Sequence, residues 1–191
     1  MITKVKRGRP RGPGTDAAIV GAAAEVLSRR GYAGMTVAAV AALAGVTEPT
    51  VYLRYPTKRD LAMAAVTHVP LFADPPDTGD AFADLTALLS RFVTMTETSG
   101  LALTGVVLSE EHDQPELLER WRATVGTAFR AVVGRIVERG RSRGQLNEAM
   151  SAELVADLLI GAHLAHYTLR GRPARGWARR VTEALRPALQ A

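Results

Sequence analysis

The sequence predicts an all-α protein in which an N-terminal three-helix helix-turn-helix domain precedes a second helical domain. Apolar residues recur at intervals of three and four through most of the 191-residue chain, which is the period of amphipathic helices. Capping residues, glycines and prolines stand at the ends of these segments, and no segment alternates as a half-buried strand does. We expect a basic disordered arm over residues 1–14, the helix-turn-helix domain over 15–69 and the second helical domain over 70–191.

The first domain is expected to begin with a helix over residues 15–30. Thr36 then caps a second helix by accepting a bond from a backbone N–H of its first turn. That helix ends at Gly45, because glycine adopts the left-handed backbone conformation without strain. Thr47 is expected to cap a third helix, with Pro49 in its first turn. Two helices joined by such a short glycine-containing turn form the helix-turn-helix motif, whose second helix enters the DNA major groove.

Thr57 is expected to cap the next helix, over 58–69, with Asp60 three residues later in a variant of the capping box. Prolines then interrupt the helical pattern before residue 80. Further along, Asp113 is expected to cap a long helix, and Pro187 to close the last one. The helices expected in the second domain span residues 82–95, 101–109, 114–140, 151–169 and 175–185.

Positive charge is concentrated in the first third of the chain. Residues 1–61 hold 10 Lys and Arg against 4 Asp and Glu, whereas residues 62–191 hold 14 against 15. This asymmetry indicates a nucleic-acid contact at one end of the molecule.

The chain has no cysteine, which excludes disulfides, thiolate metal sites and cysteine catalysis. Its apolar runs are too short for a membrane span, and the N-terminus does not fit a secretion signal. We therefore expect a cytoplasmic, nucleoid-associated protein that contacts no membrane.

Residues 44–61 carry a specific pattern, Ala44-Gly45-Val46-Thr47-x-x-Thr50-Val51-Tyr52-x-x-Tyr55-Pro56-Thr57-Lys58-x-x-Leu61. This pattern resembles the signature of TetR-type transcriptional repressors, and the similarity extends over about residues 15–61. The resemblance implies a homodimer that binds a double-stranded DNA operator. It also implies that the second domain provides dimerisation and binds a small hydrophobic or amphipathic inducer that releases the DNA. Glu48 and the Leu53-Arg54 pair depart from the family pattern, which leaves the operator sequence open.

The expected DNA contacts lie on the helix-turn-helix and on the basic arm. The resemblance implies that Tyr52 donates its hydroxyl to a phosphate, while Lys58 suits a phosphate because it stands at a helix N-terminus. Thr50 and Leu53 suit contact with base edges, including thymine methyls, and Arg54 is expected at a phosphate or a guanine. The full set of candidates is Thr36, Thr47, Pro49, Thr50, Tyr52, Leu53, Arg54, Lys58, Arg7, Arg9 and Arg11.

Three features of this domain have a second interpretation. Glu48 either reads a cytosine amino group or points away from the DNA. The arm is either a solvated tail or a minor-groove and phosphate contact, and its five cations without a nearby acid favour contact. Tyr55, next to Pro56, is expected to pack in the core.

In the second domain, the resemblance implies that part of the apolar core is a cavity for the inducer. The sequence does not separate a lined pocket from a filled core, and the candidate lining residues are Phe82, Phe92, Trp121, Val125, Phe129, His163 and Tyr167. The resemblance further implies that the last two helices pair with their two-fold mates, with burial inside the monomer as the alternative. The interface candidates are Gly161, Ala165, Trp177, Val181 and Leu185.

His163 and His166 form an i, i+3 pair that could chelate a metal ion, but no third ligand stands at a suitable spacing. We therefore expect no metal, no cofactor and no catalytic site, and we assign the histidines to the pocket or the interface. Two rival functions remain open: an architectural DNA-binding protein without a ligand, and a helical enzyme built on the histidine pair. The favoured hypothesis is a repressor released by a small molecule.

Overall fold

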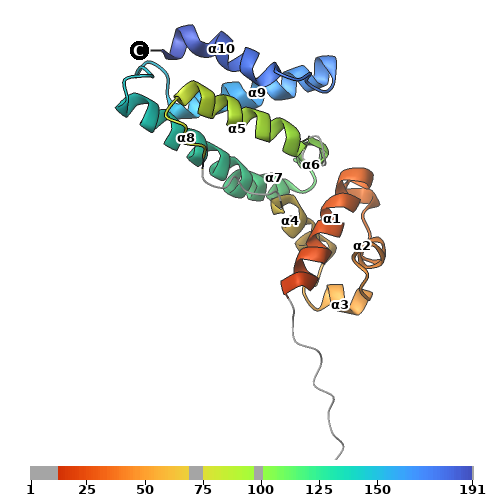
Figure 1. Cartoon of the computed structure of the whole chain (residues 1–191). Coiled ribbons are helices and arrows are strands. Elements are labelled where there is room, and N and C mark those ends of the chain that lie inside the picture. Colours follow the sequence, from red (N-terminus) through yellow and green to blue (C-terminus); the bar gives the residue numbers. More distant parts are fainter. Residues whose placement is uncertain (1–12, 69–74, 97–100, 191) are drawn as a thin grey trace, which may run out of the picture. The chain divides into compact units, whose positions relative to one another are not determined.

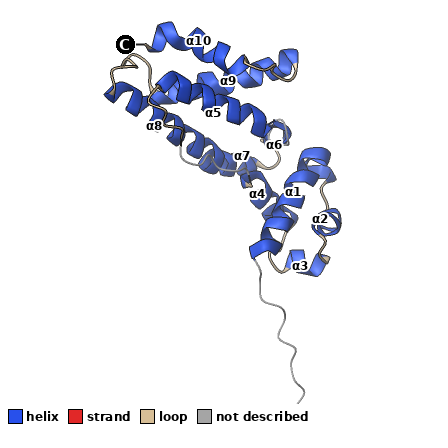
Figure 2. Cartoon of the chain, in the orientation of Figure 1, coloured by secondary structure: helices blue, strands red, loops and turns tan. Residues whose placement is uncertain are grey.

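The computed structural model describes residues 13–68, 75–96 and 101–190, and the regular elements in those ranges are helices, as Figure 2 shows. The expected all-α class is confirmed. An isolated antiparallel bridge joins Leu146 to Gln190, but no strand forms within the described ranges. The chain separates into two compact units, Met1–His68 and Val69–Ala191.

The first unit is built on α1 (Pro13–Gly34), against which α2 (Val37–Ala44) and α4 (Lys58–Thr67) pack (Figure 1). The short helix α3 (Glu48–Tyr52) contacts α2. Helix α1 contributes a stripe of fully buried side chains at helical spacing: Ile19, Ala23 and Leu27. Buried apolar residues of the other helices complete this small core: Val37, Val40, Val51, Leu61, Ala62, Ala65 and Val66.

The capping residues that the sequence predicts lie at the ends of α2 and at the start of α4. The Oγ1 atom of Thr36 accepts a bond from the backbone N–H of Ala39 at 3.2 Å. Gly45 has φ 67° and ends α2 in the left-handed conformation, which a Cβ would strain. Thr57 and Asp60 form a complete capping box at the start of α4. These caps define the ends of the two helices that flank the recognition segment.

The expected end of the first helix at Gly31 is confirmed, because that residue is non-helical, with φ 68° and ψ 177°, and a separate short helical segment follows to Gly34. One expectation for this unit needs correction. Thr47 occupies the N-cap position of α3, but its side chain makes no capping bond. Its hydroxyl instead lies 2.9 Å from the hydroxyl of Thr50, because the two side chains stand one helical turn apart.

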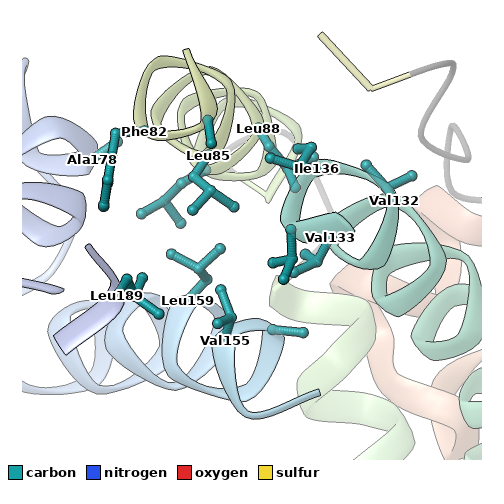
Figure 3. Close-up of a cluster of buried hydrophobic side chains, with 14 of the residues drawn as sticks. Phe82, Leu85, Leu88, Val132, Val133, Ile136, Val155, Leu159, Ala178 and Leu189 are labelled. Carbon is teal, nitrogen blue, oxygen red and sulfur yellow. The ribbon is translucent and has the colours of Figure 1, made fainter. Parts of the chain in front are cut away.

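The second unit contains α5 (Ala81–Met95), α6 (Leu101–Ser109), α7 (Pro115–Trp121), the π-helical turn η2 (Arg122–Gly126), α8 (Thr127–Ser142), α9 (Ala152–Arg170) and α10 (Trp177–Leu189). Helix α5 packs against α8 and α10, and α9 packs against α8. Figure 3 shows the core between them, in which side chains of α5, α8, α9 and α10 point toward one another. Its largest fully buried side chains include Leu85, Leu88, Ile136 and Leu159.

The single long helix expected over residues 114–140 is interrupted by η2. The hydroxyl of Thr124 donates to the carbonyl of Arg120 at 2.7 Å, and that of Thr127 donates to the carbonyl of Arg122 at 3.1 Å. Threonine hydroxyls that bond to preceding carbonyls disturb the regular helical ladder, and the second bond spans five residues, as a π-turn does. Asp113 is not the cap, because Gln114 occupies the N-cap position without a side-chain bond.

Helix α10 is longer at its C-terminal end than the sequence predicts, because Pro187 lies inside it instead of closing it. Asn147, from the loop after α8, binds the C-terminal end of this helix. Its backbone N–H donates to the carbonyl of Leu189 at 2.8 Å, and its side-chain amide donates to the carbonyls of Ala188 and Gln190. These bonds satisfy carbonyls that a helix end otherwise leaves without partners.

The glycines of α8 provide a test of this packing. A Cβ built on Gly140 would lie 2.6 Å from Cδ1 of Leu146 and 2.8 Å from Cβ of Ala81, whereas a Cβ on Gly134 meets nothing within 4 Å. We expect Gly140→Ala to lower the free energy of unfolding by about 1–3 kcal/mol through overpacking. Gly134→Ala is the matched control and should raise it by about 0.5–1 kcal/mol. Both tryptophans, Trp121 and Trp177, lie in this unit, so urea unfolding followed by tryptophan fluorescence measures it. Equal stability of the two variants would contradict this packing.

Candidate nucleic-acid interface and helical-domain core

The candidate DNA-facing surface is the outer side of the recognition segment, residues 47–54. Val51 is fully buried and anchors α3 to the first unit, whereas Tyr52 is 48% exposed and Leu53 is 67% exposed. Thr47 and Pro49 are also exposed, and Thr50 is half-buried. A large apolar side chain and a phenol are thus presented to solvent beside hydroxyl groups, a mixture that suits base edges and phosphates.

The structure places Arg54 differently from the expected DNA contact. Its side chain is only 12% exposed, and its Nε lies 2.7 Å from Oδ1 of Asp16, in the first turn of α1. Its Nη1 also donates to the carbonyl of Thr50 at 3.1 Å. The guanidinium is therefore paired inside the first unit, and its expected contact with phosphate or guanine stays a prediction.

Tyr55 follows directly and is half-buried, in agreement with its expected packing role. Burial raises the pKa of its phenol, the Asp16 carboxylate raises that pKa further, and Arg54 lowers it in part. Since the ordinary pKa of tyrosine is already about 10, the phenol is neutral at physiological pH. Tyr55 therefore adds no negative charge beside the recognition segment.

Lys58, at the start of α4, is bound to α1. Its Nζ donates to the carbonyl of Ala33 at 3.1 Å and lies 4.6 Å from the centre of the Tyr32 ring. A cation over an aromatic face is attracted by the ring, so Lys58 joins the start of α4 to the end of α1. The sequence showed no sign of this contact, because its partners lie about 25 residues away. A role at a DNA phosphate stays a prediction.

The remaining DNA candidates divide into two groups. Thr36 is exposed, but its side chain is already used as the cap of α2. Arg7, Arg9 and Arg11 lie outside the described residues. The predicted role of the basic arm therefore rests on its sequence alone.

In the second unit, the structure brings several of the candidate ligand residues together. Phe92 lies 5.3 Å from Phe129 and 5.4 Å from His163 between ring centres, and His163 lies 6.4 Å from Tyr167. His163 is fully buried, and its Nε2 lies 2.7 Å from Oγ1 of Thr96, so the two groups share a hydrogen bond. An aromatic cluster with a polar group at its centre can orient an apolar ligand, although it also serves as ordinary core.

The other ligand candidates lie elsewhere in the unit. Phe82 is buried, and the guanidinium of Arg186 lies 4.0 Å from its ring centre. Val125 is buried in η2, and Trp121 is half-buried at the end of α7. A separate concave site of about 310 Å³ is lined by Ser90, Val93, Thr94 and residues 173–178. None of the seven predicted ligand residues lines that concave site.

The predicted dimer residues also separate into two groups. Gly161 and Ala165 are exposed on α9. Trp177, however, is only 7% exposed, and its ring lies 5.9 Å from that of His163 and 5.1 Å from that of His166. Val181 and Leu185 likewise pack against the core of their own unit. Trp177 therefore packs largely within its own unit, and the pairing of the apolar face of α10 with a second copy stays a prediction.

Neither a metal site nor a membrane span was found among the described residues. No group of three or more His, Cys, Asp or Glu side chains could hold a metal ion there. His166 instead lies against the ring of Trp177. None of the described helices is long and apolar enough to cross a bilayer.

Two family models match the chain. Residues 19–65 match "Bacterial regulatory proteins, tetR family", and residues 75–185 match "Tetracyclin repressor-like, C-terminal domain". The chain is 30% identical over 164 residues to the uncharacterized HTH-type transcriptional regulator YdeS of Bacillus subtilis, covering 82% of this chain and 79% of the relative. It is also 30% identical over 165 residues to the DNA-binding transcriptional repressor TetR of Mycobacteroides abscessus, covering 81% and 87%.

Solved structures share the fold at lower sequence identity. A putative TetR-family transcriptional regulator from Mesorhizobium loti superposes with a TM-score of 0.75 at 18% identity, covering 96% of this chain and all of that chain. The regulator FadR from Bacillus subtilis, solved in complex with stearoyl-CoA, gives a TM-score of 0.67 at 19% identity, covering 88% and 96%.

The exposed phenol of Tyr52 gives the most direct test of the recognition surface. We expect Tyr52→Phe to weaken binding to specific DNA by about 1.5–3 kcal/mol, the usual contribution of a hydrogen bond to a charged group. The melting temperature should not change, since the ring remains. Tyr167→Phe, in the second unit, is the control and should leave DNA binding as it is. Fluorescence anisotropy with a labelled duplex measures both variants. Full DNA affinity in Tyr52→Phe would rule out the phosphate contact.

Proposed function

Because the chain belongs to the TetR family of bacterial regulatory proteins and is thus a DNA-binding transcriptional regulator, we propose that it acts as a homodimeric repressor released by a small hydrophobic or amphipathic inducer. In this proposal the recognition segment of each protomer enters the major groove of a double-stranded operator. The second unit provides both dimerisation and the inducer site. The protein acts on the chromosome in the cytoplasm and has no catalytic function.

The DNA-binding part of the proposal is supported by the exposure of Tyr52 and Leu53 over the buried Val51. Burial of such large exposed side chains against a partner surface is favourable, because it removes apolar area from water. The excess of positive charge in residues 1–61 supports the same assignment, because cations near the interface raise the affinity for DNA by releasing counterions.

The dimer is supported by the outer face of α9. Small residues stand there at Gly161 and Ala165, with Leu154 and Leu169 exposed on the same helix. Leu169 is 81% exposed. Small residues allow two helices to approach closely, and the leucines supply apolar area. A two-fold interface on α9 would present two recognition segments to a palindromic site.

The inducer is supported by the aromatic cluster around His163 and Thr96. FadR from Bacillus subtilis, which shares this fold, was solved with stearoyl-CoA, so a helical domain of this architecture can accommodate a ligand with a long apolar chain. Release of DNA requires a ligand that binds better to the DNA-incompetent state. The alternative is a ligand-independent architectural protein, which would bind DNA with little sequence preference.

Oligomeric state and DNA sequence preference can be tested together. Selection from a random-sequence duplex pool should enrich a palindromic site, and sedimentation should give twice the 20.4 kDa chain mass. Ala165→Arg should place a charge in the α9 interface, shift the chain toward monomer and reduce affinity for the selected duplex. Ala131→Arg, an exposed alanine on α8, is the matched control and should leave the dimer intact. A monomer at micromolar concentration for the unmutated chain would contradict the proposal.

The inducer can be tested with a library of small hydrophobic and amphipathic compounds. A true inducer raises the melting temperature, because it binds the native state, and it weakens binding to the selected duplex. By thermodynamic reciprocity, the duplex must weaken that compound by the same factor. Phe92→Ala should reduce the affinity for the compound and retain DNA binding in its absence. Tyr52→Phe should retain the affinity for the compound and reduce DNA binding. A library without such a compound, together with sequence-independent DNA binding, would favour the architectural protein.

A further inference from the structure

Asp16 and Arg54 join two parts of the first unit that lie far apart in the sequence. Asp16 is in the first turn of α1, and its Oδ1 lies 2.7 Å from Nε of Arg54, the last residue of the recognition segment. Arg54 is also bonded to the recognition helix, through Nη1 to the carbonyl of Thr50 and through its backbone N–H to the carbonyl of Val51. The ion pair therefore links α1 to the last turn of α3.

Helix α3 depends on such links for its orientation. It contains only five residues, and an isolated helix of that length is not stable in water. Its orientation must come from tertiary contacts, of which the burial of Val51 is one and the Arg54 guanidinium is another. A guanidinium that is only 12% exposed also requires a charged partner, because an unpaired charge in that position would be costly.

We propose that Asp16 is a positioning residue for DNA recognition, acting through Arg54. The pair sets the position of the last turn of α3, and with it the direction in which Tyr52 and Leu53 face the major groove. This inference rests on the DNA interface proposed above, but it assigns a role to an acidic residue that is expected to touch no DNA.

The proposal predicts the opposite sign from simple electrostatics. Asp16 is an acid in a unit with an excess of positive charge. If it acted only through its charge, its removal would strengthen binding to every DNA sequence. If it positions Arg54, its removal weakens binding to the specific site and leaves non-specific binding the same or slightly stronger.

The test compares two probes, the duplex selected by the unmutated protein and a scrambled duplex of the same composition. For Asp16→Asn we expect affinity for the selected duplex to fall about threefold to tenfold, while affinity for the scrambled duplex does not fall. Arg54→Gln should show a similar loss of preference, and the double variant should lose no more than the worse single variant. Asp16→Glu, which keeps the charge, should restore most of the preference.

Glu25→Gln is the matched control, because Glu25 also lies on α1 and pairs with an arginine, Arg29, at 2.9 Å, but on the solvent side. It should change both affinities by the same small factor. The ratio of the two affinities does not depend on the folded fraction, so partial unfolding of a variant cannot produce the expected result. An unchanged ratio in Asp16→Asn would overturn the inference alone. An unmutated protein that selects no duplex would overturn the proposed function as well.

Discussion

Val51 is the fully buried residue of α3, a helix of only five residues. The recognition surface depends on the packing of this side chain against the core of the first unit. A helix so short has no stability of its own, so its position is set by what lies under it. The burial of Val51 on the small core formed by α1, α2 and α4 leaves Tyr52 and Leu53 on the outer side. The Arg54 guanidinium adds a second attachment from the other end of the segment. The surface is thus held by the core of the first unit more than by the helix that carries it.

Two cations of the recognition motif have partners inside the first unit, so they are not simply positive charges available to DNA. Arg54 is paired with Asp16, and Lys58 is bound to the carbonyl of Ala33 and the ring of Tyr32. The sequence predicts that both residues contact DNA. Their contacts show that positive charge near a recognition helix can serve its architecture. Exposed cations of the unit, together with any contribution from the arm, therefore become more important for the affinity.

The second unit divides its apolar surface between two purposes. Trp177, Val181 and Leu185 of α10 pack into the core that α5, α8 and α9 share, so this helix covers its own domain. Helix α9 has buried residues such as Leu159 and His163 on one side and exposed small and apolar residues on the other. The aromatic cluster around His163 lies on the buried side, and the proposed dimer surface on the exposed side. One helix thus carries both the aromatic cluster and the proposed dimer surface.

The sequence by itself determined the all-α class, the caps at Thr36 and Thr57, and the turn at Gly45. Each depends on atoms within a few residues of one another, such as a hydroxyl and an N–H three positions apart. Tertiary structure decided what the sequence left open, which is the pairing of Arg54, the contacts of Lys58 and the burial of Trp177. It also decided where α10 ends, which the sequence predicts wrongly at Pro187. In each case the partner comes from another element, and Asn147 reaches the end of α10 across about 40 residues. Such contacts follow from how helices pack, and the periodicity of a single helix carries no information about the side chains it will meet.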